Sequence, residues 1–259
     1  MTDTDVFARY SRQMLLPQIG RSGQEKLAAA RIGLVGCGAL GSVIASHLVR
    51  AGVGLLRIID KDYPELHNLQ RQILFTEEDV ARRVPKAEAA AAYLRAVNSA
   101  VVVEPCVTTV DSETLPGLAD DLDLLVDGTD NFPTRFVMNE YAVRREMPWV
   151  YGGVVGTTGM SMTIVPGEGP CLRCLVRELP SREASPTADV AGVLSTIVAI
   201  IGSVEATEAI KLVVDPAARS RVLLAVDVWD LTFERLQVLK DPGCICCGQG
   251  PAGESVGKS

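Results

Sequence analysis

Short apolar runs alternate with stretches of helical periodicity along most of the chain. Continuous apolar runs, typical of strands that are buried on both faces, occupy residues 31–36, 54–60, 100–107, 121–128 and 148–156. Between them, apolar residues recur at helical spacing over residues 39–51, 85–98 and 133–146. Because parallel neighbours need crossover connections, this alternation predicts an α/β fold with a doubly wound, mostly parallel Rossmann-like sheet.

The pattern changes after residue 156. Residues 159–167 predict an antiparallel strand, and residues 191–214 predict one long, largely apolar helix. Residues 221–239 alternate in polarity and predict a pair of strands. We therefore expect antiparallel strands to continue the parallel sheet.

The length fits one large α/β domain or two small ones. Of the 259 residues, 47% are apolar, which is enough for a sizeable core. We divide the chain into a helical arm (1–30), a single domain (31–248) and a disordered tail (249–259). The net charge of −7 argues against a general nucleic-acid binder, which is usually basic.

The start of the chain is polar and lacks the apolar segment of a secretory signal. The longest uncharged stretch is too short to cross a bilayer. We therefore expect a cytoplasmic protein with no membrane segment, in which cysteines stay reduced.

A glycine-rich turn follows the first predicted strand. Gly36, Gly38 and Gly41 form a G-x-G-x-x-G motif that opens a predicted helix. Glycines permit a tight turn, and the helix N-terminus presents free N–H groups to a phosphate. Asp60 ends the next strand about 20 residues on, where an acid binds a ribose hydroxyl. The motif predicts a nucleotide site but does not separate NAD from ATP.

Polar residues beyond the turn favour a triphosphate. Asn68, Arg71 and Gln72 follow the second strand, Lys86 opens the next helix, and Asp130 follows the fourth strand. Ligands bind outside the carboxyl ends of such strands, so we expect these groups to converge. Arg and Lys neutralise phosphate oxygens and a carboxylate holds Mg²⁺, whereas nicotinamide chemistry leaves this set unexplained.

Two C-x-x-C pairs predict a structural zinc site. Cys171 and Cys174 form the first, and Cys244 and Cys247 form the second. Four thiolates satisfy tetrahedral Zn²⁺ and leave no position for a substrate. Cys246 is then a bystander or a competing ligand.

As an ordered set, these motifs resemble the MoeB/ThiF/HesA family of adenylyltransferases, bacterial relatives of ubiquitin-activating enzymes. The resemblance runs from about Arg9 to Gly248 and is carried by "RYSRQMLLPQIG", "GCGALGS", "DKDYPELHNLQRQILF", "PKAEAA", "DGTDNFPTR", "GPCLRC", "AGVL", "EAIK" and "DPGCICCG".

The resemblance implies a reaction and a partner. Such enzymes use ATP and Mg²⁺ to adenylate the C-terminal glycine carboxylate of a ubiquitin-like sulfur-carrier protein that ends in Gly-Gly. Pyrophosphate is released, and the adenylate later becomes a thiocarboxylate. The extended tail would enter a channel beneath a mobile loop at residues 177–189.

The resemblance also implies residue roles. The motif glycines, Gly36, Gly38 and Gly41, would lie along the nucleotide, with Asp60 on the ribose and Gln72 nearby. Asn68, Arg71 and Lys86 would contact the phosphates, and Asp130 would hold Mg²⁺. Arg12 would reach across a homodimer interface to the neighbour's triphosphate, and Arg135 would help orient the loop around Asp130.

Two departures from the family pattern qualify these roles. Ala188 stands where members with a persulfide-handling cysteine carry it, so we expect no thioester or acyl disulfide there. The sequence shows no sulfurtransferase domain after these motifs, so we expect a separate protein as sulfur donor. The spacing from Arg71 to Lys86 is about two residues longer than the family shows, and Arg82 or Arg83 could share the role of Lys86.

Three alternatives remain open at this level. The chain could adenylate a different acyl substrate, such as a biosynthetic peptide. It could be an NAD-dependent oxidoreductase, or a non-catalytic scaffold with this fold.

Overall fold

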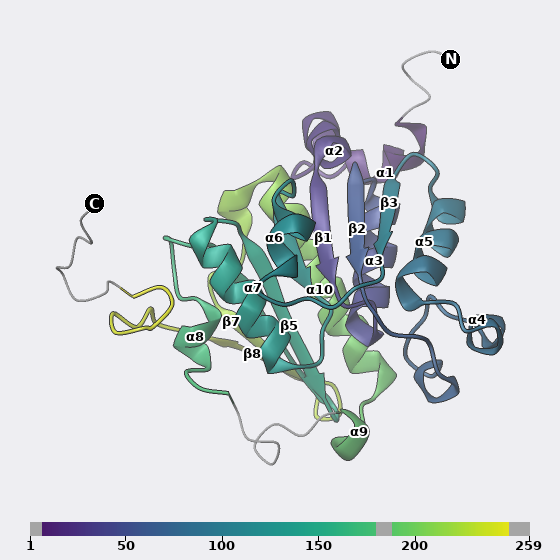
Figure 1. Ribbon diagram of the computed structural model, residues 1–259. Helices are drawn as coiled ribbons and strands as arrows, with labels where there is room; N and C mark the ends of the chain where they lie inside the picture. Colours follow the sequence, from purple (N-terminus) through teal and green to yellow (C-terminus); the bar gives the residue numbers. More distant parts are fainter. Residues whose placement is uncertain (1–6, 180–187, 249–259) are drawn as a thin grey trace, which may run out of the picture.

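One eight-stranded sheet forms the centre of the molecule. The computed structural model describes residues 7–179 and 188–248, and its strands lie in the order β3-β2-β1-β4-β5-β6-β7-β8 (Figure 1). Neighbours are parallel from β3 to β5 and antiparallel from β5 to β8, which confirms the predicted architecture. The strands are β1 (Arg31–Val35), β2 (Leu55–Ile59), β3 (Val102–Cys106), β4 (Leu124–Asp127), β5 (Trp149–Val155), β6 (Thr158–Ile164), β7 (Leu223–Asp227) and β8 (Thr232–Leu236).

Helices cover both faces of the sheet, and each face has its own apolar core. One layer comprises α2 (Gly20–Ala29), α3 (Ala39–Ala51), α5 (Lys86–Val97) and α10 (Ser195–Val214). The other comprises α6 (Thr114–Ala119), α7 (Phe132–Arg144) and α8 (Leu172–Leu175) (Figure 1). The shorter elements are η1 (Ala8–Tyr10), α1 (Ser11–Met14), η2 (Leu66–Asn68), α4 (Glu77–Arg82), α9 (Ala188–Ala191) and η3 (Pro216–Ala218).

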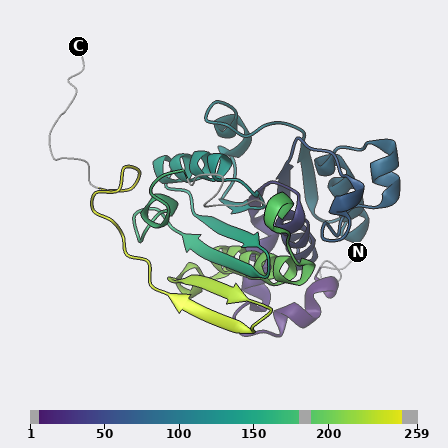
Figure 2. The same cartoon turned by 90° about the horizontal axis from the view of Figure 1, so that it is seen from below.

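Burial explains why the central strands are continuous apolar runs. All four residues of β4 are buried, because helices lie on both faces there. At the far edge, β8 pairs with β7 alone among the described residues, and all five of its residues are exposed. Figure 2 shows this outer hairpin in yellow at the edge of the molecule.

The expected helix over residues 191–214 is wrong at its start. Gly192 adopts φ +75°, and α10 begins only at Ser195. The backbone of residues 192–194 bonds to the end of the β5 region instead: Gly156 N–H donates to Gly192 O and Leu194 N–H donates to Gly156 O, both at 2.9 Å. This pairing satisfies backbone groups that a continued helix would have used.

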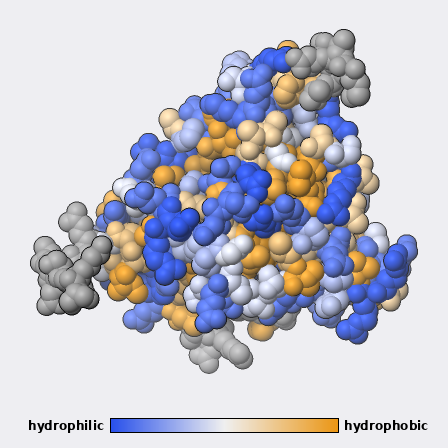
Figure 3. All heavy atoms as spheres, turned by 45° about the horizontal axis from the view of Figure 1, so that its top comes forward, coloured by the Kyte–Doolittle hydropathy of each residue, from blue (hydrophilic) through white to orange (hydrophobic). Residues whose placement is uncertain are grey.

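The N-terminal arm is packed against the domain. Tyr10 is buried, and its hydroxyl accepts a hydrogen bond from Asn98 Nδ2 at 2.9 Å. In the face shown in Figure 3, hydrophobic side chains form small groups among hydrophilic ones. Among the described residues, no helix is both long and apolar enough to cross a membrane.

Candidate functional site

The glycine turn joins β1 to α3 and touches the loop after β4. Gly36 has φ +85°, and a Cβ there would lie 2.7 Å from the carbonyl group of Gly128. A Cβ on Gly41 would lie 2.1 Å from Gly36 O. Both positions therefore need glycine, and the backbone of the turn stays open toward the cavity beside it.

Asp60 orders this turn from the end of β2. Its Oδ2 accepts from Cys37 N–H and its Oδ1 accepts from Asp62 N–H, both at 2.7 Å. Burial raises the pKa of the Asp60 carboxyl, while these hydrogen bonds and the positive charge of Lys86 oppose the rise. Asp60 lines the cavity at the position predicted for a ribose-binding acid.

A cavity of about 640 Å³ opens at the carboxyl ends of the parallel strands. The predicted residues Gly36, Gly38, Asp60, Arg71, Gln72, Lys86, Asp130 and Arg135 all line it. Its other wall consists of Tyr151, Val154 and Met160 from β5 and β6 with Val193. The cavity thus has a polar side toward the turn and an apolar side toward the β5–β6 hairpin, and no sequence signal singled out the apolar side.

Two of the predicted cations, Lys86 and Arg71, lie on the polar side of the cavity without a salt bridge to a described residue. Lys86 is buried at the start of α5, where its N–H donates to Asp62 O at 2.8 Å. Arg71 donates through Nη1 to His67 O at 3.1 Å. In the described parts of the chain neither residue forms a salt bridge, so both charges are available to an anion.

Gln72 points at the same turn. Its Nε2 lies 3.6 Å from the place where a Cβ of Gly38 would be. Its Oε1 is buried and has no hydrogen-bond partner among the described residues. A buried unpaired amide oxygen is costly, and a ligand or water donor at this point would satisfy it.

Three of the predicted nucleotide-site residues, Gly41, Asn68 and Arg12, do not line the cavity. Asn68 is buried, and its Oδ1 accepts from Glu65 N–H at 3.1 Å, so it caps η2. Arg12 is exposed on α1. The loop expected to cover the channel, residues 177–189, lies largely outside the described residues.

The loop after β4 carries two aspartates with different surroundings. Asp130 is exposed and lines the cavity. Asp127 is fully buried: its Oδ1 accepts from Thr129 N–H and Oγ1–H, and its Oδ2 accepts from Arg135 Nε at 2.7 Å. Arg135 also donates through Nη2 to Thr129 O at 2.7 Å and to Gly152 O at 2.8 Å. Arg135 thus ties the Asp130 loop to β5.

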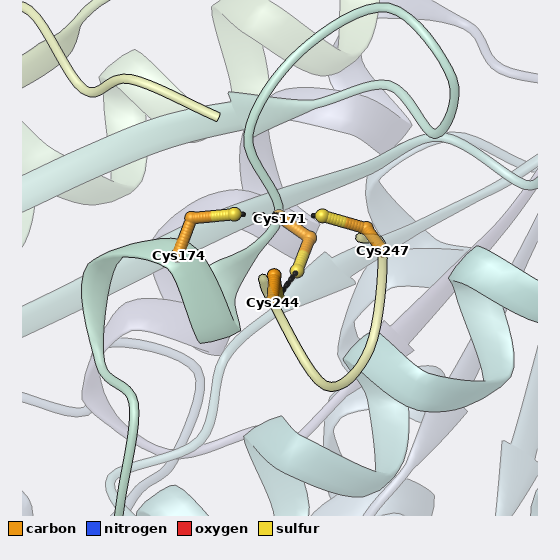
Figure 4. A group of neighbouring side chains, drawn as sticks. All are labelled: Cys171, Cys174, Cys244 and Cys247. Atoms are coloured by element: carbon orange, nitrogen blue, oxygen red, sulfur yellow. Dashed lines mark hydrogen bonds between the residues drawn. The ribbon is translucent and has the colours of Figure 1, made fainter. Parts of the chain in front are cut away.

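Four cysteine thiols that do not line the cavity form a separate cluster (Figure 4). All Sγ atoms of Cys171, Cys174, Cys244 and Cys247 lie within 4.8 Å of one another. Cys171–Cys244 measures 3.7 Å and Cys174–Cys247 measures 3.4 Å. Zn–S bonds of about 2.3 Å in a tetrahedron put sulfurs roughly 3.8 Å apart, so this donor set fits zinc.

Cys246 lies beside this cluster. Asn139 Nδ2 donates to Cys246 Sγ at 3.2 Å, and Asn139 Oδ1 accepts from Leu172 N–H at 2.9 Å. A hydrogen bond from Cys246, the largest cause, lowers the pKa of the Cys171 thiol to about 4. Cys244 and Cys247, the pair expected from spacing, belong to the four-sulfur group with Cys171 and Cys174, and Cys246 does not.

Comparison with known proteins places these features in a family. The ThiF family profile matches residues 10–246. The sulfur carrier protein ThiS adenylyltransferase of Bacillus subtilis is 44% identical over 242 residues, covering 93% of this chain and 71% of that protein. The SAMP-activating enzyme E1 of Haloferax volcanii is 38% identical, covering 96% of this chain and 91% of that protein.

Solved structures share the architecture. MccB of E. coli, crystallised with MccA-N7isoASN, superposes with a TM-score of 0.82 over 95% of this chain and 76% of that chain. Its sequence identity is 23%, so this likeness concerns the fold.

Proposed function

The chain belongs to the ThiF family, and from this premise we propose that it uses ATP to adenylate the C-terminal carboxylate of a ubiquitin-like sulfur-carrier protein. Relatives at 44% and 38% identity are named as activating ThiS and SAMP. One structural observation supports the proposal most strongly: Arg71, Lys86 and Asp130 line one cavity beside the glycine turn. This family membership favours ATP over a dinucleotide.

The charged side chains and the backbone N–H groups of the site would contact different parts of ATP. The carrier's carboxylate attacks the α-phosphate, and negative charge grows on the departing pyrophosphate. Arg71 and Lys86, which form no salt bridge in the described chain, would stabilise that charge. The N–H groups of the turn and of the first turn of α3 would bind phosphate oxygens, and Asp60 would bind the ribose.

Asp130 would hold Mg²⁺, which neutralises phosphate oxygens when bound. The exposed carboxylate fits this role, since oxygen is the ligand that Mg²⁺ prefers and no cation in the described chain occupies it. The thiol cluster would hold Zn²⁺ as a structural ion, because four sulfurs leave no open position.

Arg12 would act in a homodimer. It is exposed and away from its own cavity, so it would reach the triphosphate of a second copy. Ala188 offers no thiol at the family position, so no acyl disulfide would form there. A separate protein would supply the sulfur.

ATP–pyrophosphate exchange tests the proposal. Purified protein is assayed with a panel of carriers ending in Gly-Gly, beside Asp130→Ala and the control Asp230→Ala, an exposed acid in the β7–β8 turn. Carrier-dependent exchange should fall by about 10²-fold or more in Asp130→Ala only. Exchange with a peptide but no carrier would favour the alternative acyl substrate, and absence of ATP binding would exclude adenylation.

A further inference from the structure

Glu205 is a buried acid for which the proposed chemistry has no use. It lies on α10 with no exposed surface. Neither carboxyl oxygen has a hydrogen-bond partner among the described residues. An ionised carboxylate in such a place would carry a large desolvation cost without compensation.

The carboxyl group occupies the space that a side chain on β5 would fill. A Cβ on Gly152 would lie 2.2 Å from the Glu205 carboxyl carbon and 2.3 and 2.4 Å from its two oxygens. Ser161 pairs with Gly152 across the β5–β6 ladder, and its buried Oγ also lacks a partner in the described chain. Glu205 therefore packs directly against the backbone of β5 at Gly152.

Gly152 connects this acid to the cavity. Its carbonyl oxygen accepts from Arg135 Nη2, and the same nitrogen donates to Thr129 O in the loop that carries Asp130. A displacement of Gly152 would thus be passed through Arg135 to that loop.

The groups that face Glu205 do not compensate an anion. Asp127 on β4 repels it, and Arg135 on α7 is already paired with Asp127 at 2.7 Å. Tyr151 on β5 also lies near the acid: burial raises the pKa of its hydroxyl most, and Asp127 and Glu205 add to the rise. The titratable residues of the other packed elements, α2 and α3, are all exposed: Arg21, Glu25, Lys26, His47 and Arg50. β6 has no titratable residue. Burial, followed by the charge of Asp127, raises the pKa of Glu205 well above its ordinary value.

We propose that Glu205 is a positioning residue for the adenylation site: as an uncharged carboxylic acid, it holds Gly152, and through Arg135 it fixes the loop that carries Asp130. The link to catalysis rests on the proposed function, whereas the uncharged state of the acid does not. Ionisation of Glu205 at alkaline pH would repel Asp127, compete for Arg135 and loosen the loop.

The first arm measures stability by urea unfolding between pH 5 and 7 for wild type and Glu205→Gln. A raised pKa in the folded state gives stability that is full below the unfolded pKa of about 4.3 and declines as pH rises toward the folded pKa. The unfolding constant of wild type should therefore grow about tenfold per pH unit relative to Glu205→Gln. Glu208→Gln is the matched control on the same helix and should keep the wild-type pH dependence, because Glu208 has partners in Thr163, Lys211 and Ser220.

The second arm measures ATP affinity by calorimetry and kcat of pyrophosphate exchange from pH 7 to 10. In wild type both should fall on the alkaline side, by up to about tenfold per pH unit for a single ionisation. In Glu205→Gln the decrease in ATP affinity and kcat should begin at a pH higher by at least about one unit. Glu205→Met, with similar length and no ionisable group, should show the same move if the Gln variant does not fold.

Each outcome decides a separate claim. Equal pH dependence of unfolding in wild type and Glu205→Gln would contradict the claim that Glu205 is uncharged in the folded protein. The positioning role would be contradicted if the unfolding experiment gave the expected result but wild type and Glu205→Gln had the same pH profiles of ATP affinity and kcat. If wild type binds ATP but exchanges with no substrate, the proposed function fails, while the ATP-affinity profile still decides the role of Glu205.

Discussion

At the scale of single residues, Asp127 and Asp130 show how two acids three positions apart serve different ends. Asp127 is buried and fully occupied by Thr129 and Arg135. Asp130 is exposed toward the cavity and forms no salt bridge in the described chain. The first therefore fixes the loop, and the second is available to a cation.

Removal of the buried partner of Asp127 should cost far more stability than removal of a surface charge. Arg135→Ala leaves Asp127 buried and unpaired, so we expect a loss of about 3–5 kcal/mol in urea unfolding. The comparison is Arg21→Ala, since the Arg21–Glu25 pair is exposed and should contribute less than about 1 kcal/mol. Similar losses in both variants would contradict a structural role for the buried pair.

Sequence reasoning identified the residues with free charges and, through the family resemblance, Arg135 beside the Asp130 loop, but not the other contacts that hold the site. Arg71, Lys86 and Asp130 were predictable because strand ends bring their positions to one edge. Asn68 was expected at the phosphates, yet its side chain caps η2. The Arg135–Gly152–Glu205 contacts join residues far apart in sequence, and no local pattern encodes such contacts.

At the scale of elements, the turn between β1 and α3 depends on close backbone contact. In Gly41→Ala, the new Cβ would lie 2.1 Å from Gly36 O and force the turn open. We expect a loss of about 1–3 kcal/mol in thermal unfolding, together with weaker ATP binding by calorimetry.

Gly117→Ala is the control for this change. Gly117 lies in α6 with no atom within 4 Å of its added Cβ. Alanine there should stabilise the protein by about 0.5–1 kcal/mol and leave ATP binding as it is. If Gly41→Ala behaved like this control, the contact would have no role in the turn.

Long periodic segments were predictable, and their interruptions were not. The parallel strands and α3, α5 and α7 match the apolar pattern because burial on a sheet imposes it. The break at Gly192 arises from hydrogen bonds to Gly156, which is 36 positions away. The short helices α4 and α6 are too brief to show a helical period.

At the scale of the whole molecule, a mixing experiment tests whether two copies share a site. Arg12→Ala and Asp130→Ala should each be inactive in exchange assays. If Arg12 serves the neighbour, mixed dimers contain one complete site, and an equal mixture should recover about one quarter of wild-type activity. No recovery after verified subunit exchange would place Arg12 outside the neighbour's site.

The thiol cluster gives a second prediction at this scale. Purified protein should contain one zinc per chain by elemental analysis, and Cys247→Ala should lose it, because Cys247 Sγ lies within the four-sulfur group. Cys246→Ala should retain the metal, since Cys246 is outside that group. The opposite pattern would exchange the roles of the two cysteines.

The spacing of those thiols has a consequence for the unfolded chain. Each close sulfur pair, Cys171–Cys244 and Cys174–Cys247, joins residues 73 positions apart. A metal held by all four would therefore close a polymer ring around α10, β7 and β8. If the ion stayed bound during unfolding, the ring would reduce the entropy of the denatured chain by about 4 kcal/mol at 25 °C, by the estimate used for a covalent cross-link. The ion would thus stabilise the folded protein by restricting the conformations of the denatured chain.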